Sequence, residues 1–253
     1  MIGALIAYPF VLIAQRPTAA IALIVVSIAI FFALDLAFAE LGYNALYDDP
    51  ASSNGRLYTL VTNLISMFVS GFAMALALQH LGQRTQNPSL RDGVALLALG
   101  VWYGIAVLLP FVLVAALAAG GASYFAPEPY RMHVAVAAAG LVALPLIYVS
   151  VRLWFAGPRT LLDERIHLYQ SWPLTRGRFW PILGTTLLSL IPTVVLVVAP
   201  QILFEALFTL NMLPDGQVWE IAEMGITEVF FVFGAFYFYS AQSFIFHRLS
   251  VEP

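Results

Sequence analysis

The chain has 253 residues, of which 61 % are hydrophobic and 10 % are charged, and its formal net charge is −3. Its mean hydropathy of +0.89 excludes an ordinary soluble domain, in which about a quarter of the residues are charged. The absence of cysteine excludes disulfides, thiolate catalysis and cysteine-ligated metals. The composition therefore predicts an integral membrane protein, and no basic block indicates a nucleic-acid partner.

The first apolar segment, residues 1–14, is too short to cross a hydrocarbon core, which needs about 20 helical residues. We expect it to lie at the membrane interface or to pack on the bundle. Six longer apolar segments follow at about 18–39, 57–78, 94–119, 134–155, 179–208 and 225–247. The sequence therefore predicts an all-α fold, a single polytopic helical bundle over 1–253 with about six transmembrane helices.

Prolines and small residues suggest how these spans bend and pack. Pro192 and Pro200 in the fifth span predict a kink or a partly broken helix. The pairs Ser66/Ser70 and Gly100/Gly104 are spaced to let the second and third spans approach other helices closely.

The arginines predict the orientation of the chain. All of them except Arg56 and Arg131 fall on one side of the predicted spans, which places both termini and the interval 151–181 in the cytoplasm. An arginine precedes each successive pair of spans, at Arg16, Arg91 and Arg178. This layout suggests three tandem hairpins, although residue identity between them is negligible.

The interval 151–181 is the long polar interruption of the chain. Residues 159–170 place apolar side chains on one broad helical face and polar ones on the other, the pattern of a helix lying on a bilayer surface. The Ser171-Trp172-Pro173 sequence is expected to end that helix, because proline removes a backbone donor. We expect an amphipathic cytoplasmic surface helix between spans four and five.

The same interval carries a recognisable motif. Its residues are Arg152, Pro158, Glu164, Ser171, Trp172, Leu174, Thr175, Gly177 and Trp180. The motif resembles that of the bacterial glycerophosphoryl diester phosphodiesterase membrane-domain family and of related uncharacterised six-span inner-membrane proteins. The resemblance implies a multi-pass protein of the bacterial inner membrane. The soluble phosphodiesterase barrel is absent from this chain, so hydrolysis of glycerophosphodiesters is not carried over.

Two interpretations of Arg152 remain open. It pairs with Glu164 and so holds the surface helix against the bundle, or it anchors span four to lipid phosphates while Glu164 faces water.

Three carboxyl groups lie inside apolar runs near the predicted outer ends of spans one, five and six. They are Asp35, Glu205 and Glu228. A carboxylate in hydrocarbon is costly, so an intramembrane acid is a candidate functional group. These residues form a candidate outer-leaflet acidic site for a cation or proton if they converge, and otherwise they reach the outer interface.

The sequence gives no support for catalysis, a cofactor or a metal. It contains no GxSxG elbow, no phosphate-binding glycine loop and no HExxH pair, and its four histidines have no ligand spacing. We therefore expect a non-enzymatic protein that organises membrane lipid or binds another membrane or cytoplasmic protein. A small-solute or lipid transporter is the alternative, and an intramembrane lipid enzyme is the second alternative. A polar cavity joining Asn63, Thr185 or Thr186 to the carboxylates would favour transport.

Overall fold

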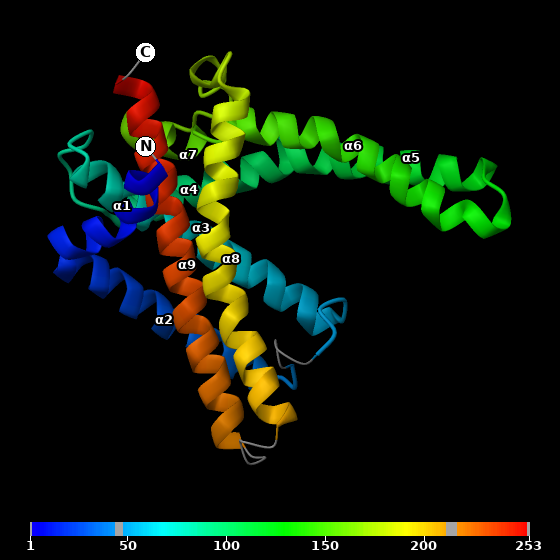
Figure 1. Ribbon diagram of the computed structural model, residues 1–253, viewed down its shortest axis with the longest axis horizontal. Helices are drawn as coiled ribbons and strands as arrows, with labels where there is room; N and C mark the ends of the chain where they lie inside the picture. The colour runs from blue at the N-terminus through cyan, green and yellow to red at the C-terminus, as the bar shows by residue number, and fades with distance from the viewer. Residues whose placement is uncertain (1, 44–47, 211–216, 252–253) are drawn as a thin grey trace. The chain divides into compact units, whose positions relative to one another are not determined.

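The computed structural model describes residues 2–43, 48–210 and 217–251, and these residues form helices and connecting turns without a strand (Figure 1). Within these described ranges, six helical stretches are long and apolar enough to cross a membrane. The predicted all-α multi-pass fold is thereby confirmed. Asp215, which lies between the predicted fifth and sixth spans, is outside the described part of the chain.

The helices follow the predicted spans with small shifts at their ends. The elements are α1 (Ile2–Gln15), α2 (Pro17–Glu40), α3 (Ser53–His80), α4 (Leu90–Tyr103), the π-helical turn η1 (Gly104–Leu108), α5 (Leu109–Phe125), the short 3-10 turn η2 (Glu128–Tyr130), α6 (Arg131–Leu153), α7 (Ala156–Asp163), the 3-10 turn η3 (Pro173–Thr175), α8 (Phe179–Thr209) and α9 (Gln217–Val251).

The single domain expected from the sequence divides into two compact units. The first consists of Met1–Val94 and Gly184–Pro253 and holds α1, α2, α3, α9 and most of α8. The second is Ala95–Leu183 and holds α5, α6, α7 and the motif interval.

Helix α9 is the centre of the first unit, because α1, α2 and α3 all pack against it. Helix α8 runs beside it, where Gly234 of α9 faces Thr193 and Val197 of α8 (Figure 1). The short helix α1 buries Leu5 and Leu12 almost completely, in keeping with a helix that packs on the bundle.

Two polar contacts define one end of the first unit. His80 at the end of α3 lies 2.6 Å from the side-chain oxygen of Gln15, and Gln83 donates to Ser250 at 2.9 Å. The ends of α1, α3 and α9 therefore meet at this end. The end of α2 and the start of α3 meet at the opposite one, where Tyr58 contacts Asp35.

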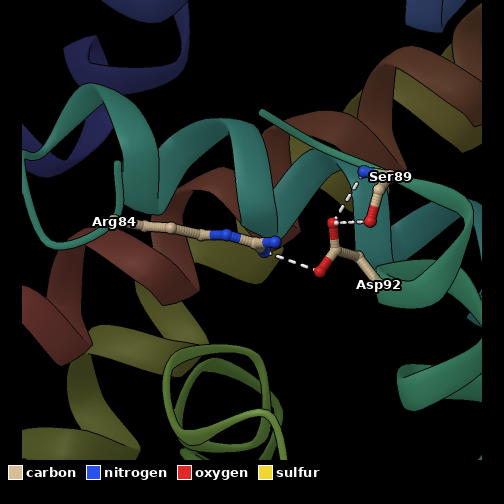
Figure 2. Close-up of polar contacts among 3 residues, drawn as sticks. All are labelled: Arg84, Ser89 and Asp92. Carbon is tan, nitrogen blue, oxygen red and sulfur yellow. Dashed lines mark hydrogen bonds and ion pairs between the residues drawn. The ribbon is translucent and has the colours of Figure 1, made fainter. Parts of the chain in front are cut away.

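The turn between α3 and α4 is closed by a polar cluster in which the side chains of Arg84 and Asp92 are buried and Ser89 is exposed (Figure 2). Arg84 pairs with one oxygen of Asp92, and the backbone amide of Ser89 donates to the other at 2.7 Å. Ser89 precedes the first residue of α4, so Asp92 returns a hydrogen bond to the helix start in the manner of a capping box.

The close approach of α3 and α4 occurs at Gly71 and Gly93. A Cβ atom on Gly71 would lie 2.7 Å from the backbone carbonyl carbon of Asp92, and one on Gly93 would lie 2.7 Å from the ring of Phe68. At Gly104, by contrast, a Cβ would have open space. The expectation that Gly104 permits a close helix contact was therefore wrong, because the tight crossing lies nearer the start of α4.

Helices α5 and α6 of the second unit pack along each other as a hairpin (Figure 1). Tyr103 and Ser150 share a 2.6 Å hydrogen bond near its base. The π-helical turn directly precedes Pro110, whose ring and missing amide disturb the regular ladder of the preceding turn.

Helix α8 is continuous through Pro192 and Pro200, so of the two alternatives predicted for the fifth span, a kink or a partly broken helix, the broken helix was wrong. Hydroxyl groups bond to the backbone near the first proline: Ser189 donates to the Thr186 carbonyl at 2.8 Å, and Thr193 donates to the Ser189 carbonyl at 3.1 Å. Such side-chain bonds help membrane helices to tolerate proline.

Candidate functional site: a polar cavity in the first unit

A cavity of about 240 Å³ lies between α2, α3, α8 and α9. Its polar lining comes from Asp35, Tyr58, Thr62, Gln201, Thr227 and Glu228, and its apolar lining from Val197, Met224 and Phe231. Four separate helices therefore bring polar groups to one place within an otherwise apolar bundle.

Two acidic side chains form the centre of this cavity. Asp35 is 5 % exposed and Glu228 is 8 % exposed, and their carboxyl groups lie within hydrogen-bonding contact. Oε2 of Glu228 is buried and has no hydrogen-bond partner among the described residues. An unpartnered buried carboxyl oxygen is costly, so it marks the side of the cavity at which a ligand proton or cation would be stabilised.

Tyr58 of α3 completes the acidic pair by donating a 2.6 Å hydrogen bond from its hydroxyl to Oδ1 of Asp35. Sequence reasoning missed this residue, because a tyrosine near the end of a span is typical of a membrane interface. The spacing of Tyr58 from the next polar residues of α3 could have identified it, since residues four apart share a helix face.

That signal is a polar face on α3. Tyr58, Thr62, Ser66 and Ser70 follow at intervals of four along the helix. The hydroxyl of Tyr239 on α9 contacts both serines. A second cavity of about 20 Å³ next to them has room for one water molecule. Polar groups therefore continue from the acidic pair into the interior of the first unit.

The structure brings together two of the three predicted acids. Glu205 is exposed on α8 and does not line the cavity. The groups expected to connect the carboxylates to the membrane interior also differ, because Thr62, Gln201 and Thr227 line the cavity and Asn63, Thr185 and Thr186 do not.

The motif of the second unit forms a separate buried cluster around Arg152, which is 8 % exposed. Nε and Nη2 of Arg152 donate to the Tyr148 hydroxyl at 3.0 and 2.8 Å, and Nη1 lies 3.4 Å from the hydroxyl of Thr175. Its guanidinium lies 5.1 Å from the Tyr148 ring centroid and 5.4 Å from that of Trp172. The carbonyl of Arg152 accepts from the Ser171 and Thr175 hydroxyls.

The other motif residues differ in their exposure. Pro158 is buried in α7, Leu174 is partly buried in η3, Gly177 adopts a positive φ of 74° and Trp180 is 76 % exposed. Glu164 is exposed and has a φ of 54°, in the left-handed region that ends α7. The observed contacts of Arg152 thus give it an aromatic and hydroxyl environment inside the second unit.

The surface helix expected over 159–170 is shorter and lies earlier, at Ala156–Asp163. The chain turns at Glu164, and the amide of His167 donates to the hydroxyl of Thr160 at 3.1 Å. Gly157, Pro158 and Leu161 are buried, so α7 packs against protein along this face. Residues 164–170 form turns in place of the expected helix, because local hydrogen bonds reverse the backbone there.

No group of three or more histidine, aspartate or glutamate side chains in the described ranges has the arrangement of a metal site. The polar groups that line the cavity are a carboxyl pair, a phenol, an amide and hydroxyl groups. No family model, curated protein or solved structure matches the chain.

Proposed function

We propose that this protein is a small, non-enzymatic permease that carries protons through the cavity of Asp35, Tyr58 and Glu228. The observation that supports this proposal most strongly is the contact between the Asp35 and Glu228 carboxyl groups. Two carboxylates this close repel each other when both are ionised, so the pair favours sharing a proton. Two acids inside a membrane bundle are costly unless they have a function or all their oxygens have hydrogen-bond partners. One oxygen of Glu228 has no such partner among the described residues.

The polar face of α3 supports proton movement over binding alone. Hydroxyl groups at Thr62, Ser66 and Ser70 continue inward from Tyr58, and Tyr239 adds a further one from α9. Each hydroxyl can both donate and accept, which is the property a proton relay requires.

Potential-driven proton uptake into proteoliposomes tests this function. A potassium gradient with valinomycin supplies the potential, and a trapped pH dye reports the flux. Wild-type protein should acidify the vesicles faster than protein-free vesicles do. Asp35→Asn and Glu228→Gln should reduce the rate to the protein-free level.

Glu205→Gln is the matched control, since it removes an exposed carboxyl of α8 that does not line the cavity. Its rate should equal that of wild type. Wild-type vesicles no faster than protein-free vesicles would refute the proposal, as would undiminished flux in Glu228→Gln.

A lipid-organising or partner-binding role is the second candidate, and the motif resemblance supports it. The specific observation is the exposure of Trp180 and Tyr169 in the motif interval, at 76 and 58 %. Amphipathic aromatic residues of this kind favour the headgroup region of a bilayer. Quenching by headgroup-labelled lipid tests this role in a variant that keeps Trp180 and carries phenylalanine at the other four tryptophans. Equal quenching of Trp180 by an aqueous agent would refute it.

The proposed location follows from the same resemblance and from the arginine pattern. We infer a multi-pass protein of the bacterial inner membrane, with both termini in the cytoplasm and membership of the phosphodiesterase membrane-domain family. The shared end of Arg16, His80 and Ser250 in the first unit is consistent with this orientation.

A further inference from the structure

A large apolar groove runs along α2 and α3 of the first unit, with a volume of about 570 Å³. Its length is lined by the apolar side chains Leu23, Val26, Ile30, Phe68, Phe72 and Leu76. The groove follows two helices that are each long enough to cross a membrane. Its walls therefore present hydrocarbon over much of the length of a lipid acyl chain.

The groove ends in polar groups. Arg16, Gln79 and Asn87 line this end, and Nε2 of Gln79 donates to Oδ1 of Asn87 at 2.8 Å. Arg16 is exposed, and no carboxylate among the described residues pairs with it. The groove thus combines an apolar length with a single available cation at its end.

This combination selects one class of occupant. Along membrane-crossing helices the groove borders lipid hydrocarbon, and an acyl chain seated in it would pack against its apolar walls. A guanidinium presents paired donors that match the oxygens of a phosphate. We propose that the groove binds one phospholipid, with an acyl chain along Leu23 and Phe72 and the headgroup phosphate on Arg16.

Native mass spectrometry of the full-length protein tests this site. The protein is exchanged into a mild detergent and titrated with phosphatidylglycerol or with diacylglycerol of the same acyl chains. One phosphatidylglycerol should bind to wild type, and diacylglycerol should bind at least about tenfold more weakly, since it lacks the phosphate partner of Arg16.

Two variants test the headgroup contact and the acyl-chain contact separately. Arg16→Gln should weaken phosphatidylglycerol binding about tenfold, to the level of diacylglycerol. Ala22→Phe, at an exposed groove position, should displace the acyl chain while leaving Arg16 in place. Arg56→Gln removes the same charge at the opposite end of α2 and α3 and should leave binding unchanged.

Each alternative has its own result. Equal binding of diacylglycerol and phosphatidylglycerol, or wild-type affinity in Arg16→Gln, would overturn the phosphate contact. Competition by inorganic phosphate with Ala22→Phe unaffected would identify a free-phosphate site and overturn the lipid assignment. Co-migration of a protein partner released by Ala22→Phe would also overturn it. Matching elution profiles and melting temperatures of Arg16→Gln and Arg56→Gln show that a loss of binding is local.

Discussion

Arg84 and Asp92 form an ion pair of 2.6 Å whose side chains are only 8 % and 5 % exposed. The pair joins the turn after one membrane helix, α3, to the first turn of the next, α4 (Figure 2). Breaking a buried pair leaves one charge without compensation, which costs far more than the pair itself contributes.

Arg84→Met should therefore lower stability by roughly 3–5 kcal/mol. Thermal unfolding in detergent, followed by circular dichroism, measures the loss. Glu128→Gln is the matched control, because the Glu128–Arg131 pair has a similar 2.8 Å distance but is 83 % and 52 % exposed. Exposed pairs contribute about 0–1 kcal/mol, so a loss in Arg84→Met as small as that of the control would contradict a stabilising role for the buried pair.

Gly71→Ala should destabilise the crossing of α3 and α4. The added methyl group would meet the backbone of Asp92 and Gly93, and backbone cannot give way as a flexible side chain can. Overpacking of this kind costs about 1–3 kcal/mol. The melting temperature in detergent should fall, whereas Gly140→Ala, which has open space around its Cβ, should leave it equal or raise it. An unchanged melting temperature in Gly71→Ala would show that the helices can separate without cost.

Charge exchange tests how Arg152 is held. Arg152→Glu removes the donors to Tyr148 and the stacking on Trp172, which in a desolvated setting contributes about 2 kcal/mol. Glu164→Arg cannot restore either contact, so the double variant should remain as sensitive to proteolysis within 164–172 as Arg152→Glu alone. Arg165→Glu, at an exposed neighbouring position, is the control for charge. Recovered protection in the double variant would instead establish the Arg152–Glu164 pair.

The arginine pattern predicts the orientation in the membrane. A reporter active only outside the cytoplasm should be active when fused after Asp49 and silent when fused after Glu164. A cytoplasm-dependent reporter at the same two positions should give the reverse result. Activity of the external reporter at Glu164 would overturn the predicted orientation.

The helices could be predicted from sequence because their length and hydrophobicity depend on nearby residues. The predicted span 18–39 became Pro17–Glu40, and 57–78 became Ser53–His80. The competition between helix formation and local turns was harder to predict. Residues 164–170 have a helical apolar pattern, yet the turn at Glu164 and the bond between His167 and Thr160 divert the backbone.

The candidate site was predictable only in part. Asp35 and Glu228 stand out in sequence because charge is rare within spans, and the structure brings them together. Which acid is left out depends on how each helix is rotated about its axis, and Glu205 does not line the cavity. Tyr58 and Gly71 were missed because their roles depend on neighbours distant in sequence.

The packing of α1 on α9 has a consequence for biosynthesis. Tyr8 stacks on Phe244 with a centroid separation of 4.9 Å, and α2 and α3 also pack against α9. Every one of these helices leaves the ribosome before its partner has been made. The early helices must therefore wait in the bilayer with their inward faces on lipid or on insertion factors, and the first unit closes only when α9 arrives. Its assembly is consequently a late event that a truncation within α9 would prevent.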